Sequence, residues 1–171
     1  MDKFLNKLSE YHFIQSLVPG MIFTYCSKIF YGINFLTDKP VYDFIVILII
    51  GLIISRIGSI IVEPLLRKVK ILNFCKYTDY IEASQKDSLI KNLSETSNLY
   101  RVIIATFLVL LVEKVYLIIT EKFDWLNDWS YLVISVLLIV LFVFSYRKQT
   151  KYIKQRIDKS KENIQIILPK E

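Results

Sequence analysis

The sequence is poor in the residues that most folds use for turns, cross-links and metal sites. Glycine and proline each occur only four times among 171 residues, which disfavours a loop-rich or all-β fold. The two cysteines and the single histidine form no Cys-x-x-Cys or Cys/His cluster, so we expect no zinc or redox centre and no bound metal or cofactor. No nucleophile–base arrangement and no Gly-rich phosphate loop is present, and we therefore expect no enzyme activity.

Long apolar runs are what the sequence has in excess. Hydrophobic residues make up 54% of the chain, against about 45–50% for soluble domains, and the mean hydropathy is +0.43. A membrane span needs about 20 mostly apolar residues. Four segments compete: 13–36, 42–66, 102–119 and 130–146. They predict an all-α fold, a four-span transmembrane bundle in one membrane domain.

The first of these segments is the weakest. It carries Gln15, Lys28 and a Pro19-Gly20 pair that we expect to break the helix. A three-span chain with residues 13–36 lying in the membrane interface is the main alternative.

Basic residues predict the orientation of the spans. The N-terminal segment, the connector 67–101 and the tail 147–171 hold 17 Lys and Arg residues, whereas the two remaining loops hold only 2. Because cytosolic loops carry the excess of Lys and Arg, we expect both termini, the connector and the tail to be cytosolic. The connector and the tail are expected to form helical extensions of the bundle.

Several charged residues lie inside the predicted spans. Helical rise places Arg56 about 16 Å and Glu113 about 18 Å from the cytosolic ends of their spans, so we predict that they form a pair. Lys28 and Lys114 fall within roughly 6 Å of the same level. Glu63 follows Arg56 by two turns on nearly the same face, near the cytosolic interface. This polar layer either fixes the register of the spans or lines an aqueous path.

Span 42–66 also has small residues at every fourth position. Gly51, Ser55 and Ser59 lie on one helical face and would let neighbouring helices approach closely. We therefore predict that this span is the central packing helix. Four short spans make a thin bundle, so a pore would require a symmetric homo-oligomer.

The cytosolic parts offer basic and aromatic side chains for a ligand. We expect a short helix and then one that begins near residue 87 and runs into the third span, while the tail continues the fourth. The connector either docks on its neighbours or binds a ligand, and the tail either lies on anionic lipid, bundles between subunits or binds phosphate. The candidate ligand residues are Arg67, Lys68, Lys70, Tyr77, Tyr80, Tyr100, Arg101, Arg147, Lys148 and Lys151.

The run from Tyr77 to Ala105, with its YIEA, KDSLIKNL and NLYRVIIA pieces, resembles the small multi-pass membrane effectors of bacterial anti-phage defence, in particular the Hailong-type effector. The resemblance implies an oligomeric channel, a tetramer, in the bacterial inner membrane. It also implies a nucleotide or oligonucleotide signal, made by a partner nucleotidyltransferase, that controls the channel. Opening of the channel would depolarise the infected cell. No ligand residue is carried over from the family.

Two hypotheses of function remain. The first is a channel-forming defence effector that is gated from the cytosol by a phosphate-rich ligand. The second is a non-conducting membrane anchor or assembly subunit, in which the buried charges only fix register. A small transporter is disfavoured because the sequence shows no internal repeat.

Overall fold

The computed structural model describes the backbone of residues 2–73, 75–123 and 125–167, and the side chains of 13–73, 75–123 and 129–161. Within these ranges the chain forms helices and no strand, which confirms the all-α prediction. The helices are α1 (Asp2–Tyr31), α2 (Pro40–Ile57), the π-helix η1 (Gly58–Val62), α3 (Glu63–Lys68), α4 (Tyr77–Lys86), α5 (Ser88–Lys122) and α6 (Trp125–Ile167).

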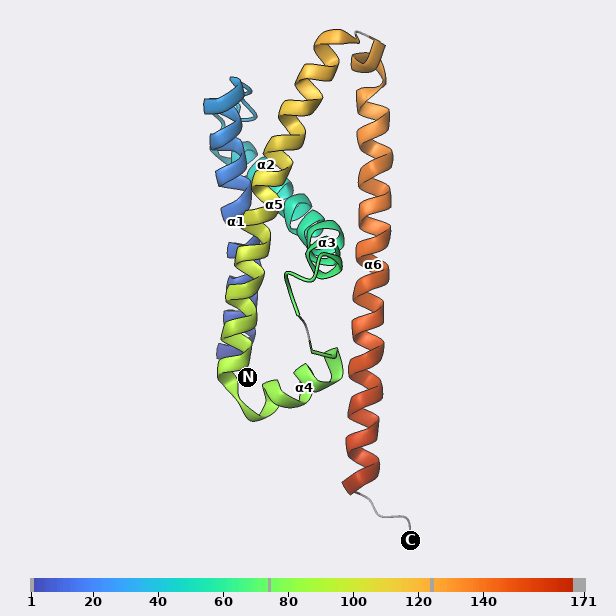
Figure 1. Cartoon of the computed structure of the whole chain (residues 1–171). Helices are drawn as coiled ribbons and strands as arrows, with labels where there is room; N and C mark the ends of the chain where they lie inside the picture. The colour runs from blue at the N-terminus through green and yellow to red at the C-terminus, as the bar shows by residue number, and fades with distance from the viewer. Residues whose placement is uncertain (1, 74, 124, 168–171) are drawn as a thin grey trace.

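The long helices share one direction along the molecule, with one exception (Figure 1). Helices α1, α5 and α6 follow the long axis of the molecule, whereas α2 crosses obliquely from the far end of α1 toward α6 (Figure 1). The start of α1, helix α4 and the end of α6 lie toward the same end of the molecule (Figure 1). Helix α2 with η1 contacts α1, α5 and α6, so it occupies the centre of the bundle.

Three helical stretches are long and apolar enough to cross a membrane: Pro40–Lys68, Ser88–Lys122 and Trp129–Lys161. They contain the predicted spans 42–66, 102–119 and 130–146. Helix α1 does not meet the same criterion within the described residues, so the first predicted span is not established by composition. The molecule is therefore a membrane protein with three helices of spanning length.

Helix α1 differs from the prediction in two ways. The expected break at Pro19 is wrong, because the helix runs through it and the proline ring is fully buried. The helix also ends at Tyr31 rather than continuing to position 36. Gly32 has φ +73 and its N–H bonds Lys28 O at 3.1 Å, a left-handed helix end that glycine adopts without strain.

Two glycines let α1 and α2 touch backbone to backbone. A Cβ on Gly51 would lie 1.6 Å from Ser16 O, and one on Gly20 would lie 2.0 Å from Ile47 O. No residue larger than glycine can occupy either position without moving the helices apart. Gly20, beside the buried proline, therefore serves helix contact and not a turn.

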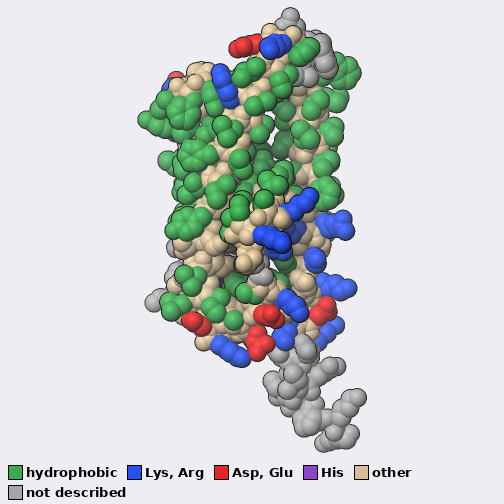
Figure 2. Space-filling view, in the orientation of Figure 1, with side chains coloured by type: hydrophobic (Ala, Val, Ile, Leu, Met, Phe, Trp, Pro, Cys, Tyr) green, Lys and Arg blue, Asp and Glu red, His purple; other side chains and the backbone are tan. Residues whose placement is uncertain are grey.

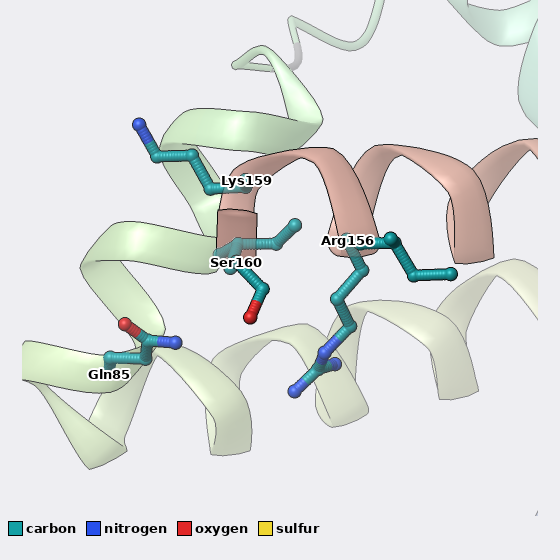
Figure 3. Close-up of a pocket in the computed structure, with 6 residues that line it drawn as sticks. Gln85, Arg156, Lys159 and Ser160 are labelled. Carbon is teal, nitrogen blue, oxygen red and sulfur yellow. The ribbon is translucent and has the colours of Figure 1, made fainter. Parts of the chain in front are cut away.

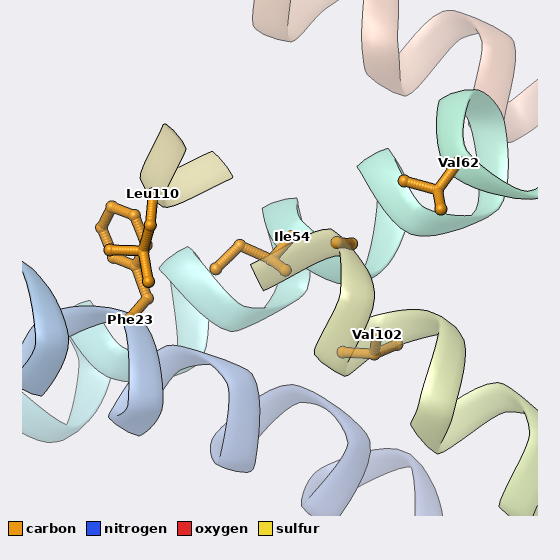
Figure 4. Close-up of a cluster of buried hydrophobic side chains, with 6 residues drawn as sticks. Phe23, Ile54, Val62, Val102 and Leu110 are labelled. Atoms are coloured by element: carbon orange, nitrogen blue, oxygen red, sulfur yellow. The ribbon is translucent and has the colours of Figure 1, made fainter. Parts of the chain in front are cut away.

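The apolar core joins α1, α2, η1 and α5. It consists of Phe23, Ile54, Val62, Val102, Ala105 and Leu110 (Figure 4). In α6, only Leu141 and Ser145 are buried among residues 129–161. Most other apolar side chains in this stretch are exposed on the single chain, as expected for a helix that faces lipid, while Leu138 and Tyr152 are half-buried.

The π-helix η1 lies between Arg56 and Glu63. A π-turn takes up one extra residue, which offsets the two side chains by about 100° relative to an uninterrupted α-helix. The prediction that they share nearly the same face is therefore wrong. Gly58 at the start of η1 lies against α5, where its Cβ would be 3.3 Å from Ala105 Cβ.

The connector folds as the sequence predicts. Helix α4 is the expected short helix, and α5 begins at Ser88 and runs without interruption to Lys122. Asp87 caps α5, because its Oδ1 accepts a hydrogen bond from Leu89 N at 2.8 Å.

Candidate functional site

A buried carboxylate joins the three helices α3, α5 and α6. Glu63 of α3 is 8% exposed. Its Oε2 accepts from Arg101 Nη1 of α5 at 2.9 Å and from Lys148 Nζ of α6 at 3.1 Å, and its Oε1 accepts from Arg67 Nη2 at 3.4 Å. We call Glu63, Arg67, Arg101 and Lys148 the Glu63 cluster.

Lys148 attaches α6 to this cluster. Besides Glu63, its ammonium group donates to Ser59 O at 2.8 Å and to Ser59 Oγ at 2.9 Å. An ammonium group has three N–H donors, and the three acceptors here all belong to η1 and α3. Ser59, which the sequence suggested as a helix-packing residue, thus bonds α6 through its hydroxyl and carbonyl. Ser55 is buried in α2, and Gly51 lies at the crossing with α1.

Positive charge exceeds negative charge around Glu63. Arg56 lines a cavity of about 30 Å³ together with Ser59, Ser145, Lys148 and Tyr152, and no hydrogen bond or ion pair joins it to another described side chain. Arg101 Nε is buried without a hydrogen-bond partner among the described atoms. Three cationic side chains therefore share the carboxylate of Glu63, and a fourth, Arg56, lines the cavity beside Lys148.

Aromatic side chains of α4 and α6 lie next to the cluster. The ring of Tyr77 in α4 stacks on that of Tyr152 in α6, with centroids 4.6 Å apart, and Tyr80 lies 6.2 Å from Tyr77. Lys148 Nζ lies 5.8 Å from the Tyr152 ring centre. The connector therefore docks on the tail, next to the Glu63 cluster.

The structure brings together only part of the predicted ligand set. Arg67, Arg101 and Lys148 meet at Glu63, and Tyr77 and Tyr80 lie beside them. Exposed positions outside the cluster hold Lys68, Lys70, Tyr100, Arg147 and Lys151. Sequence reasoning missed Tyr152, although its place one helical turn after Lys148 puts both on one face of α6.

A second polar site lies farther along α5. Glu113 Oε1 accepts from the fully buried Ser27 Oγ of α1 at 2.7 Å, while Glu113 Oε2 is buried without a hydrogen-bond partner among the described atoms. Lys114 Nζ lies 5.7 Å from the ring centre of Tyr31. Lys28 and Lys114 are both exposed on the single chain. We call Ser27, Lys28, Glu113 and Lys114 the Glu113 face.

The predicted pair of Arg56 and Glu113 does not form. Gly58 lies against Arg101 and Ala105, which places Arg56 near this level of α5. Ala105 precedes Glu113 by eight residues, or about 12 Å of helix. The depth estimate from the sequence assumed upright helices, and the oblique course of α2 makes it wrong. The predicted polar layer is therefore two sites at different levels.

A cavity of about 330 Å³ forms a notch between α4 and the lower part of α6. Its lining is Ile81, Gln85, Arg156, Ile157, Lys159 and Ser160 (Figure 3). Glu82 beside it accepts from Lys86 Nζ at 2.9 Å and lies 3.7 Å from Lys159 Nζ. The hydrogen bond and charge of Lys86, and then the charge of Lys159, lower the pKa of Glu82.

Comparison with known proteins adds no assignment. The chain matches no protein-family model, no curated protein and no solved structure. The Glu63 cluster and the Glu113 face are the features of the molecule that bear on function.

Proposed function

We propose that the chain forms an oligomeric ion channel whose aqueous path runs along the Glu113 face. One observation carries this proposal. Two lysines of the face are exposed on the outside of a single chain, beside a glutamate with an unpartnered buried oxygen. Near them, the exposed side chains of α1 and α5 include the apolar residues Ile29, Phe30, Leu111, Val112 and Val115.

The energetic cost of placing a charge in hydrocarbon favours contact between the Glu113 face and water. Lys114 follows Arg101 by 13 residues, or about 20 Å along α5, within a hydrocarbon layer about 30 Å thick. A charge at the centre of such a layer costs about 2.5–3.5 kcal/mol on insertion scales. Lys114 lies about 10 Å from the far edge of such a layer, so its cost is below the central value, and water in a lumen between copies would lower it further.

A single copy has little room for such a path. Between the described spans, the cavity at Arg56 measures about 30 Å³, the share of liquid volume taken by about one water molecule. A lumen therefore requires several copies arranged around an axis. Four copies is the number that the resemblance to Hailong-type effectors favours.

The proposal includes four spans with both termini in the cytosol. Helix α1 supports a fourth span because it crosses α2 in backbone contact and also packs on α5. In Figure 2, hydrophobic side chains cover the upper part of the molecule, and most basic ones gather below. The positive-inside rule then puts the lower end in the cytosol, in the inner membrane of a bacterium.

We further propose that a nucleotide or oligonucleotide from a partner enzyme gates the channel from the cytosol in anti-phage defence. The support is the resemblance of residues 77–105, together with excess basic charge and stacked tyrosines where the spans meet the connector. Opening would depolarise the cell. The alternative is a non-conducting anchor or assembly subunit, favoured by the ion pairs of Glu63, which also suit a device that fixes helix register.

Ion flux from purified protein in liposomes separates the two functions. The channel predicts flux, and in planar bilayers it predicts that Lys114→Gln shifts permeability toward cations and Glu113→Gln toward anions. Lys122→Gln and Glu121→Gln, at the exposed end of α5, are matched controls. Absence of flux from the wild-type protein favours the anchor, and unchanged selectivity in both Glu113-face variants contradicts the proposed path.

A further inference from the structure

The Glu63 cluster resembles an anion-binding site in which the bound anion is the carboxylate of Glu63 itself. We propose that a phosphate-bearing ligand replaces Glu63 as the counter-ion of Arg101 and Lys148, and thereby releases α6 from α3 and α5. The inference rests on the proposed gating function. It assigns the control of gating to the carboxylate of Glu63.

Charge and hydrogen bonding favour this exchange. Glu63 faces Arg67, Arg101 and Lys148, and Arg56 lines the adjoining cavity, so positive side chains outnumber the carboxylate at which they meet. Arg101 Nε is buried without a partner in the described part of the chain. A phosphate group brings more acceptor oxygens than a carboxylate, and the guanidinium fork suits it well.

Helix α6 is the element that such an exchange would free. Among its described residues, only Leu141 and Ser145 are buried, and Lys148 makes its three bonds to Ser59 and Glu63 alone. In the described part of the chain, α6 also contacts the connector through the stack of Tyr152 on Tyr77 and the ion pair of Lys159 with Glu82.

The stacked rings of Tyr77 and Tyr152 offer a ligand a second place to bind. The rings of Tyr77 and Tyr152 are 4.6 Å apart, and Lys148 lies near the Tyr152 ring. A nucleobase can stack on an aromatic face in place of another ring. A ligand with both a phosphate and a base would therefore compete with Glu63 and with Tyr77 at adjacent positions.

Phosphate can reach this site from two sources. A soluble nucleotide or oligonucleotide would arrive from the cytosol. An anionic lipid headgroup would arrive laterally, because basic pockets between spans at the cytosolic side bind such headgroups. Both offer the same chemistry to Arg101 and Lys148, so the experiment has one arm for each.

Distances between α3 and α6 test the release without any measurement of ion flux. Spin labels are placed at Leu65 and Tyr146, both exposed, in protein whose Cys26 and Cys75 are replaced by alanine, and labelled chain is diluted with unlabelled chain. One arm adds a short single-stranded oligodeoxynucleotide to protein in phosphatidylcholine nanodiscs. The other uses phosphatidylglycerol nanodiscs without oligonucleotide. We expect the distance to increase in at least one arm.

The Glu63→Gln variant should show the released distance without ligand. It should also bind the probe of the responding arm roughly 5- to 150-fold more tightly, the range of ordinary coupling between sites. Glu82→Gln, which removes a carboxylate from another contact of α6, is the matched control and should match the wild type. If Glu63→Gln does not fold, Glu63→Asp replaces it, because a shorter carboxylate cannot hold all three cations.

The proposal is overturned if neither arm changes the distance, or if the Glu63 variant has the wild-type distance and affinity. A ligand-dependent distance in a protein that passes no ions would leave this proposal standing and contradict the channel.

Discussion

The close contact of α1 and α2 predicts that alanine substitutions at three glycines will change stability to different degrees. A Cβ would lie 1.6 Å from the nearest backbone oxygen at Gly51 and 2.0 Å at Gly20, but 3.3 Å from a side-chain methyl at Gly58. Ordinary contact begins at 3.4 Å, so Gly51→Ala requires the helices to separate by about 2 Å in a close-packed interior. Gly58→Ala requires only a small adjustment.

The three substitutions are not expected to change the free energy of unfolding in the same direction. Overpacking of this kind costs about 1–3 kcal/mol, and we expect Gly51→Ala and Gly20→Ala at the upper end because backbone, not a side chain, blocks the Cβ. Alanine gains about 1 kcal/mol over glycine in helix propensity, which offsets the small contact cost at Gly58. Gly58→Ala should therefore leave stability unchanged or raise it.

Thermal unfolding in detergent, followed by circular dichroism, measures this series. Gly51→Ala and Gly20→Ala should lower the midpoint, and Gly58→Ala should not. Wild-type stability of Gly51→Ala, or equal losses at all three positions, would refute the backbone contact between α1 and α2.

Other contacts give predictions of the same kind. Lys148→Gln removes the ammonium that bonds Ser59 and Glu63, while Arg67 and Arg101 still neutralise Glu63, so it should destabilise the fold by about 1.5–3 kcal/mol, the contribution of a hydrogen bond to a charged group; chemical denaturation measures it, and no loss would contradict the attachment of α6. Tyr152→Ala removes the stack on Tyr77, worth about 0.5–1.5 kcal/mol, and should speed proteolysis of the connector; unchanged cleavage would argue against docking. The lowered pKa of Glu82 means that its contact with the tail persists above the ordinary value of 4.5 and is lost as pH falls through the lowered folded-state pKa. Proteolysis of the connector by an acid protease should therefore accelerate only below that ordinary value in the wild type, and Glu82→Gln should remove this pH step.

The sequence predicts the helical fold and the longest helices because these depend on local pattern. Apolar length, the absence of breakers after Asp87 and the small residues of α2 all act within one segment. The end of α1 was missed because the segment stays apolar to position 36, while Gly32 adopts a left-handed conformation that stops the helix. Pro19 was misread because burial against other helices overrides its local tendency to break a helix.

The polar sites could be predicted only in part. The sequence identifies Arg56, Glu63 and Glu113 as unusual, since charges are rare within apolar runs. It does not predict their partners, because these depend on the oblique angle of α2 and on the extra residue of the π-turn. Glu63 therefore pairs with Arg101 and Lys148 across helices, and Arg56 does not reach Glu113.

Aqueous access to position 114 tests the proposed channel most directly. Lys114→Cys is made in protein whose native cysteines are alanine, reconstituted in planar bilayers, and exposed to a charged, membrane-impermeant thiol reagent while current is recorded. The account predicts that the reagent changes the current at Lys114→Cys and has no effect at Leu137→Cys on the exposed apolar surface of α6. Failure of the reagent to modify Lys114→Cys in the bilayer, although it reacts in denatured protein, would contradict a water-filled path along the Glu113 face.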